Sequence, residues 1–228
     1  MNENIYEVEY VFCLPGRTFS SNFLTSWSNT LIYLMQNQIS FIYCNFYTPI
    51  LNYTRNSLIR RFPGDYKDLN SNSVLPFDNR VKCKKIIFID DDMVWTPEDI
   101  EKLIKSDKDI IGGFYKMNIN DPRGVLAASQ NNESIYDRDI IGKTDPIKLT
   151  GIGFGLIAIK QDVFNNIEFP WFGTRETINK DTGNVEIQSD DFYFCEKAID
   201  SGYEIYGDPT IQLGHEKNKT LKIGVYHE

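Results

Sequence analysis

Three consecutive aspartates, Asp90, Asp91 and Asp92, follow the apolar run of residues 86–89 in the segment IIFIDDDMVW. Such a run is typical of a strand buried on both faces of a sheet. In a continuing strand, Asp90 and Asp92 point the same way and Asp91 the other. Two carboxylates held ~4–5 Å apart repel by a few kcal/mol, which a divalent cation with oxygen ligands offsets. The triplet therefore predicts a metal or ligand site, with a solvated acidic turn as the alternative.

A second acidic pair, Asp190 and Asp191, lies in the segment QSDDFYFCEKAID at residues 188–200. Carboxylates at a helix start can be simply stabilising, by ~0.3–1 kcal/mol each. They can also act as a general base. His215, one of two histidines, follows a short apolar stretch in GDPTIQLGHEK. Imidazole is a common metal ligand, although a lone histidine is more often a surface or core residue.

Two further segments carry residues that could contact a small ligand. Residues 149–157, LTGIGFGLI, contain small residues such as Gly153 that let a ligand approach the backbone. Their G-x-G-x-G spacing is not that of a dinucleotide-binding fingerprint. Residues 169–172, FPWF, offer the rings of Trp171 and Phe172 as faces for a sugar, although aromatic residues lie more often in a core. Gly153, Trp171 and Phe172 are therefore candidate ligand contacts.

Strand and helix patterns alternate along the chain and must position these residues. Helical spacing predicts helices at 21–36, 52–61, about 97–106 and 189–201, and a loop at 62–80. Strands are predicted at 6–14, 40–47, 86–89, 110–116, 124–129, 155–160, 204–206 and 211–213. This order predicts one α/β domain over residues 1–228, with a mixed, mostly parallel central sheet flanked by helices. Open sheets of this kind bind ligands beyond the carboxyl ends of their strands, where the aspartates lie.

Composition excludes some classes of protein. The 228 residues include 24 Lys and Arg against 32 Asp and Glu, a net charge of −8, which disfavours nucleic acid as a partner. No secretory signal is visible, and no apolar stretch approaches the ~20 residues of a membrane span. We therefore expect a soluble cytoplasmic protein. An acidic protein that binds an anionic ligand must also supply positive charge locally.

The apolar strand, D-x-D and following helix resemble the DxD motif of GT-A fold glycosyltransferases, in the broad family 2-like group. The resemblance implies a Rossmann-like domain in which Asp90 and Asp92 hold Mn²⁺ or Mg²⁺ at the diphosphate of a nucleotide-sugar, with Asp90 and Asp91 also near the nucleotide. The segment at 188–200 resembles the family's xED segment. Asp191 then matches the catalytic base of inverting members, and Asp190 stands where glutamate is usual, beside the acceptor.

The same resemblance assigns further residues along the chain. His215 matches a third metal ligand near the end of the domain. Pro15 and Arg17 occupy the loop that flanks the nucleotide, and Arg55 and Asn56 occupy a helical segment that does the same, with Arg55 supplying positive charge for the diphosphate. The resemblance also implies a nucleotide-binding half at about 1–117, an acceptor-binding half at about 118–228, and a glycan or other hydroxyl compound as acceptor. Gly153, Trp171 and Phe172 would then contact this acceptor. It spans roughly residues 6–217 and is carried by short motifs.

Two other functions fit part of the pattern. Asp90 to Val94 also satisfy the hhhDxDx(T/V) motif of haloacid-dehalogenase-type phosphatases. That motif usually lies on the first strand, whereas about 85 residues precede it here, and no second aspartate follows Asp208 where a later motif needs one. The third hypothesis is a non-catalytic metal- or sugar-binding module, which leaves Asp191 unexplained.

Overall fold

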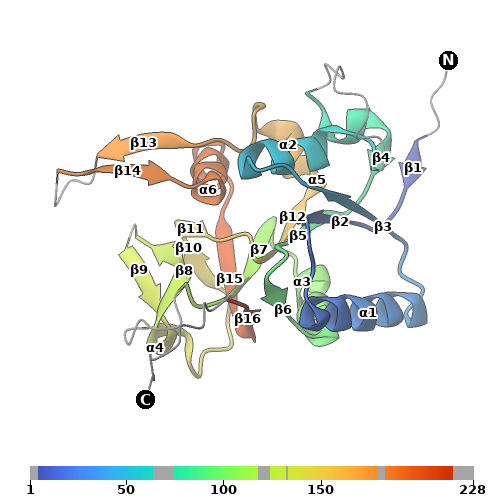
Figure 1. Cartoon of the computed structure of the whole chain (residues 1–228), viewed down its shortest axis with the longest axis horizontal. Helices are drawn as coiled ribbons and strands as arrows, with labels where there is room; N and C mark the ends of the chain where they lie inside the picture. Colours follow the sequence, from blue (N-terminus) through green and yellow to red (C-terminus); the bar gives the residue numbers. More distant parts are fainter. Residues whose placement is uncertain (1–4, 64–73, 118–123, 132, 179–182, 218–228) are drawn as a thin grey trace, which may run out of the picture.

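The computed structural model describes residues 5–63, 74–117, 124–131, 133–178 and 183–217 (Figure 1). Its centre is a seven-stranded sheet in the order β10-β15-β7-β12-β5-β2-β3. The antiparallel strands are β10 and β12, and the others run parallel to one another. The sheet strands are Ile147–Leu149 (β10), Ile205–Gln212 (β15), Ile110–Phe114 (β7), Leu156–Lys160 (β12), Lys85–Ile89 (β5), Tyr10–Pro15 (β2) and Phe41–Phe46 (β3). The prediction of a mixed, mostly parallel sheet is confirmed.

Helices cover both faces of this sheet. Strand β5 shows why, because all its side chains are buried and alternate between two cores. Ile87 and Ile89 belong to the core with helices α1 (Ser21–Gln36) and α3 (Pro97–Lys105). Ile86 and Phe88 belong to the other core, with α2 (Leu51–Arg60), α5 (Gln161–Asn166) and α6 (Asp190–Asp200). The apolar run therefore predicted the central strand correctly.

Local signals also place the helix ends well. Helix α1 has the bounds predicted from its spacing. At α3, Thr96 and Asp99 form a capping box, in which the Asp99 carboxylate accepts a hydrogen bond of 2.9 Å from the Thr96 backbone amide. Ser20 caps α1 by accepting from the Phe23 amide at 3.0 Å.

The rear of the chain differs more from the prediction. The strands expected at 204–206 and 211–213 form one strand, β15, because a register shift between Gly207 and Gln212 accommodates Pro209 without ending the strand. The predicted loop at 62–80 lies mostly outside the described residues, and Pro76–Asn79 form a 3₁₀ turn.

The remaining elements are short. Pairs form between β1 (Tyr6–Glu7) and β4 (Val81–Lys82), between β6 (Met93–Val94) and β16 (Gly214–His215), and between β13 (Arg175–Ile178) and β14 (Val185–Gln188). A three-stranded sheet contains β8 (Val125–Gln130), β9 (Glu133–Tyr136) and β11 (Gly151–Ile152). The short helix α4 (Asp137–Ile140) directly follows β9. Within the described residues, no helix has the length and apolarity needed to cross a membrane.

Candidate functional site

The three aspartates form a turn rather than the end of a strand. Strand β5 ends at Ile89, and the Met93 backbone amide donates to the Asp90 carbonyl at 3.3 Å. The prediction that Asp90 and Asp92 share one face through strand alternation is therefore wrong, because the backbone turns between them. The turn packs against the loop after β2 so closely that a Cβ on Gly16 would lie 2.4 Å from the Cβ of Asp91. Only glycine fits there without moving the turn.

Arg55 joins this turn to the start of α6. Its Nη2 atom donates to both carboxylate oxygens of Asp90 at 2.9 and 3.0 Å, and its Nη1 atom donates to Asp190 at 2.8 Å. The Arg55 side chain is 2% exposed and lies 5.1 Å from the ring centre of Phe154. One guanidinium therefore holds two carboxylates that are a hundred residues apart in sequence.

The ionisation of this network follows from its burial. Burial raises the pKa of Asp90 to about 6, although Arg55 opposes the shift and the neighbouring charges of Asp191 and Asp92 reinforce it. Burial likewise raises the pKa of Asp190 against the effect of Arg55. For Arg55, burial alone would lower the pKa, but the two carboxylates raise it. The arginine is therefore charged, and it is committed to its acidic partners.

These contacts correct two predictions for α2. Arg55 was expected to face a diphosphate, but both of its terminal nitrogens already bind carboxylates and the side chain is buried. Asn56 was expected to flank the nucleotide. Its Nδ2 atom donates to the Asn52 and Phe172 carbonyls at 2.8 and 2.7 Å, and its Oδ1 atom accepts from the Trp171 and Phe172 amides. Asn56 therefore fixes the 169–172 loop against α2.

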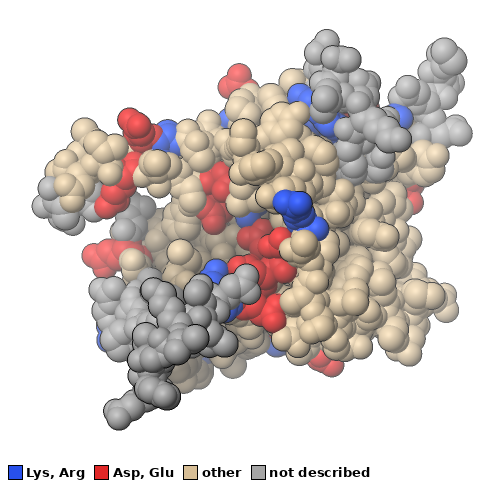
Figure 2. All heavy atoms as spheres, viewed as in Figure 1, with Lys and Arg blue, Asp and Glu red and all other residues tan. Residues whose placement is uncertain are grey.

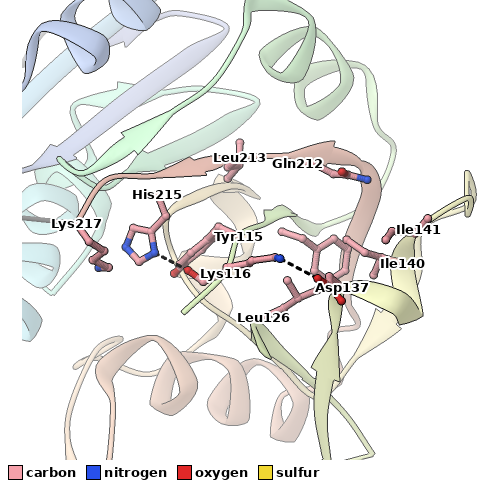
Figure 3. A pocket seen from close by; sticks show the side chains of 11 residues that line it. Tyr115, Lys116, Leu126, Asp137, Ile140, Ile141, Gln212, Leu213, His215 and Lys217 are labelled. Carbon is pink, nitrogen blue, oxygen red and sulfur yellow. Dashed lines mark hydrogen bonds and ion pairs between the residues drawn. The ribbon is translucent and has the colours of Figure 1, made fainter. Parts of the chain in front are cut away.

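Asp92 faces His215 at the junction of β6 and β16. The His215 Nε2 atom lies 2.9 Å from Asp92 Oδ2. On the other side of the ring, Nδ1 lies 2.7 Å from the Lys116 carbonyl oxygen (Figure 3). A carbonyl only accepts, so Nδ1 carries a proton and donates it to Lys116, and Nε2 is the ring nitrogen that faces Asp92. Tyr115 holds the ring from the side, with the two ring centres 4.9 Å apart. Burial would raise the pKa of Asp92, but His215 and Lys217 lower it below its usual value.

This pair fits a divalent cation. Two ligands that bind one ion at ~2.1 Å and at right angles lie ~3 Å from each other, which is the separation of His215 Nε2 and Asp92 Oδ2. The bond from Nδ1 to a carbonyl is the outer contact that orients metal-ligating histidines. Asp90 is held by Arg55, and the described residues contain no cluster of three potential metal-ligating side chains. A cation here would take its other ligands from water or from a substrate phosphate.

Asp191 lies at the start of α6, beside the Arg55 network. Asp190 points inward and is 6% exposed, whereas Asp191 is only half-buried. The Asp191 Oδ1 atom accepts from the Phe192 amide at 2.8 Å and from the Ser189 hydroxyl. These bonds hold one carboxylate oxygen at the helix start. Asp190, expected beside the acceptor, instead secures α6 to the aspartate turn.

A cavity of about 450 Å³ opens between the aspartate turn and the loop after β2. Acidic side chains gather near the middle of this face (Figure 2). Lys217 also lines this cavity, and its ammonium group donates to Asp92 at 3.1 Å, beside the candidate metal pair. The sequence analysis did not identify this lysine as a site residue. The signal for it was its place two residues after His215. The cavity is lined by Thr18, Phe19, Ser20, Asp91, Asp92, Glu216 and Lys217.

The other predicted contacts lie in different settings. Pro15 ends β2 and is buried, whereas Arg17 is exposed in the following loop, next to the residues that line the cavity. Trp171 and Phe172 are 0% and 1% exposed, so neither ring offers a face to a sugar, and the expectation of acceptor stacking is not retained. A Cβ on Gly153 would lie 2.1 Å from the Tyr115 hydroxyl oxygen, so this glycine makes room for Tyr115.

No protein-family model matches the chain, and no curated protein matches it. The chain is similar to the crystal structure of A197 from STIV, at 15% identity over 96% of this chain and 100% of that chain, with a TM-score of 0.47. It is similar to the catalytic domain of Drosophila beta1,4galactosyltransferase 7 in complex with xylobiose, at 9% identity over 94% and 72% of the two chains, with a TM-score of 0.49. It is also similar to GalNAc-T7 with UDP, GalNAc and Mn²⁺, at 9% identity over 94% and 44% of the two chains, with a TM-score of 0.45.

Proposed function

We propose that this protein is a metal-dependent glycosyltransferase that moves a sugar from a nucleotide-sugar donor to an acceptor hydroxyl. The observation that carries the proposal is the Arg55 bridge. Arg55 bonds to Asp90 in the aspartate turn and to Asp190 at the start of α6. The same turn carries Asp92, which faces His215, and Asp191 follows Asp190 on the helix. In the proposal, this one buried contact keeps the cation-binding pair and the general base on neighbouring elements.

The donor diphosphate is proposed to bind in the cavity beside the aspartate turn. Asp92 and His215 would hold Mn²⁺ or Mg²⁺, which supplies Lewis-acid stabilisation of the leaving diphosphate. Lys217 adds a charge-assisted donor next to this pair, and so supplies the local positive charge that Arg55 does not. Asp91 lines the same cavity, and the exposed Arg17 directly precedes its lining residue Thr18. Both side chains are proposed to contact the nucleotide.

Asp191 is proposed to remove the acceptor proton as the hydroxyl attacks C1 from the face opposite the diphosphate, which inverts the configuration. Its Oδ1 atom is held by the helix start, which leaves Oδ2 to accept a proton. Within the proposal, residues 1–117 form the nucleotide-binding half and residues 118–228 the acceptor-binding half of one domain.

The test uses three matched Asp→Asn variants. After nucleotide-sugars are screened with Mn²⁺ for transfer or hydrolysis, Asp92→Asn should lose the activity. Asp191→Asn should lower kcat by ~10²–10⁴-fold while donor Kd stays near wild type. Asp107→Asn, at a side chain that is 90% exposed, controls for the loss of charge and should behave as wild type.

Several outcomes would refute the proposal. Full activity in Asp92→Asn, or undiminished wild-type activity in excess chelator, would remove the metal. If the donor binds but is never turned over, the protein is a binding module. The phosphatase alternative needs Asp90 as a nucleophile with a free oxygen, but both Asp90 oxygens accept hydrogen bonds from Arg55, which disfavours it.

A further inference from the structure

A second cavity, of about 430 Å³, lies between α2 and the 169–174 loop, away from the aspartate turn. Helix geometry separates the two sites. Arg55 and Arg60 are five positions apart on α2, so their side chains diverge by about 140°, and Asp191 and Tyr193 on α6 diverge by about 160°. Arg55 faces the aspartates, whereas Arg60 and Tyr193 line this cavity. The two helices lie side by side above the sheet (Figure 1).

Arg60 is the charged side chain that lines this cavity. Its Nε atom is buried without a hydrogen bond, and the described part of the chain gives its guanidinium no ion pair. The ring centre of Phe169 lies 5.9 Å from the Arg60 guanidinium carbon. Among the residues that the structure describes, none with an acidic side chain lines the cavity. A buried guanidinium N–H without a hydrogen bond is costly, and an anion bound to the same side chain would compensate for it in this acidic protein.

The rest of the cavity wall is suited to a polar ring. Tyr53 and Tyr193 bring phenol hydroxyls and ring faces, and Asn52 and Thr174 bring further hydrogen-bonding groups. The wall is held in place, because Asn56 bonds the backbone of residues 171 and 172 to α2 through three hydrogen bonds of 2.7–3.2 Å. The volume lies in the range of small-molecule sites.

We propose that this cavity binds an anionic sugar, whose carboxylate or phosphate pairs with the Arg60 guanidinium and whose ring lies between Tyr53 and Tyr193. Arginine recognises either anion through two parallel hydrogen bonds. Both groups share this chemistry, so the two sources of charge are separated by the probes. The proposal does not depend on the transferase function, because it rests on side chains outside that site.

The experiment is an NMR titration of the full chain that follows the Gly173 and Thr174 amides, with glucuronate and glucose 6-phosphate as probes. At least one probe should saturate these shifts, and Arg60→Gln should weaken its binding by at least ~10-fold, the loss expected for a charge-assisted hydrogen bond. Arg138→Gln removes an exposed arginine that also lies over a tyrosine ring, and it should bind as wild type.

Saturation by glucuronate alone assigns a carboxylate ligand, and saturation by glucose 6-phosphate alone assigns a phosphate. The proposal is overturned if neither probe saturates at millimolar concentration, if Arg60→Gln binds as tightly as wild type, or if neutral glucose binds equally well. If circular dichroism shows that Arg60→Gln does not fold, Tyr193→Phe replaces it. This variant removes one hydroxyl and should weaken binding several-fold, and unchanged affinity would count against the site.

Discussion

Replacing Arg55 with methionine should destabilise the protein in a strongly pH-dependent way. The substitution keeps much of the apolar stem but removes three hydrogen bonds and the charge between Asp90 and Asp190. Their side chains are 22% and 8% exposed, so water compensates only in part. Breaking a buried ion pair by removing one partner costs ~3–5 kcal/mol, and we expect the lower end here, near ~3 kcal/mol at pH 7.5.

The sign of the pH effect follows from the carboxylates. In the wild type, the pKa of Asp90 is about 6, raised above its ordinary value by burial, so the folded state binds more protons and stability falls as pH rises from ~4 to ~6. Without Arg55 the pKa values of Asp90 and Asp190 rise further, so this fall is deeper and extends to higher pH. The stability difference between wild type and Arg55→Met should therefore shrink to ~1 kcal/mol near pH 4.5, where the carboxyls are largely protonated.

Equilibrium urea unfolding at pH 4.5 and 7.5 measures this difference. Trp27, Trp95 and Trp171 are all buried, so their fluorescence reports unfolding. Adding Asp90→Asn to Arg55→Met should recover part of the loss at pH 7.5, since it removes one unpaired charge. A destabilisation that is the same at both pH values would show a packing defect instead, and it would refute our account of the network.

Three further changes test other contacts. His215→Ala should weaken Mn²⁺ binding at least ~10-fold in calorimetry, because it removes the nitrogen that faces Asp92 at 2.9 Å; equal affinity would contradict this. Burial lowers the pKa of Lys85 to about 8, so the unfolded state binds more protons between pH 8 and ~10.5. Wild-type stability measured against Lys85→Met should therefore rise by ~2–3 kcal/mol across that range, and a constant difference would disprove the shift. Gly16→Ala places a Cβ 2.4 Å from the Cβ of Asp91, so it should lower the free energy of unfolding by ~1–3 kcal/mol. Urea denaturation measures this loss, and unchanged stability would mean that the turn adapts freely.

The sequence alone determined the features that depend on near neighbours. The spacing of apolar residues determined α1, and Thr96 and Asp99 determined the start of α3, because a helix turn and its cap involve residues three or four apart. The apolar run determined the buried central strand β5 and placed the aspartates at its end. The expectation that metal ligands meet near this strand end came from the same local pattern.

Only the tertiary structure decided which side chains face one another. Arg55 meets Asp90 across 35 residues and Asp190 across 135, and no local pattern distinguishes these partners from a bound diphosphate. A tryptophan can lie in a core or at a sugar site, and the residue type does not distinguish the two. Trp171 packs against Phe164 and lies in the core. The physical reason is common to these cases. The partners of a charged or aromatic side chain are set by the crossing of distant elements, and burial then decides whether that side chain remains available to a ligand.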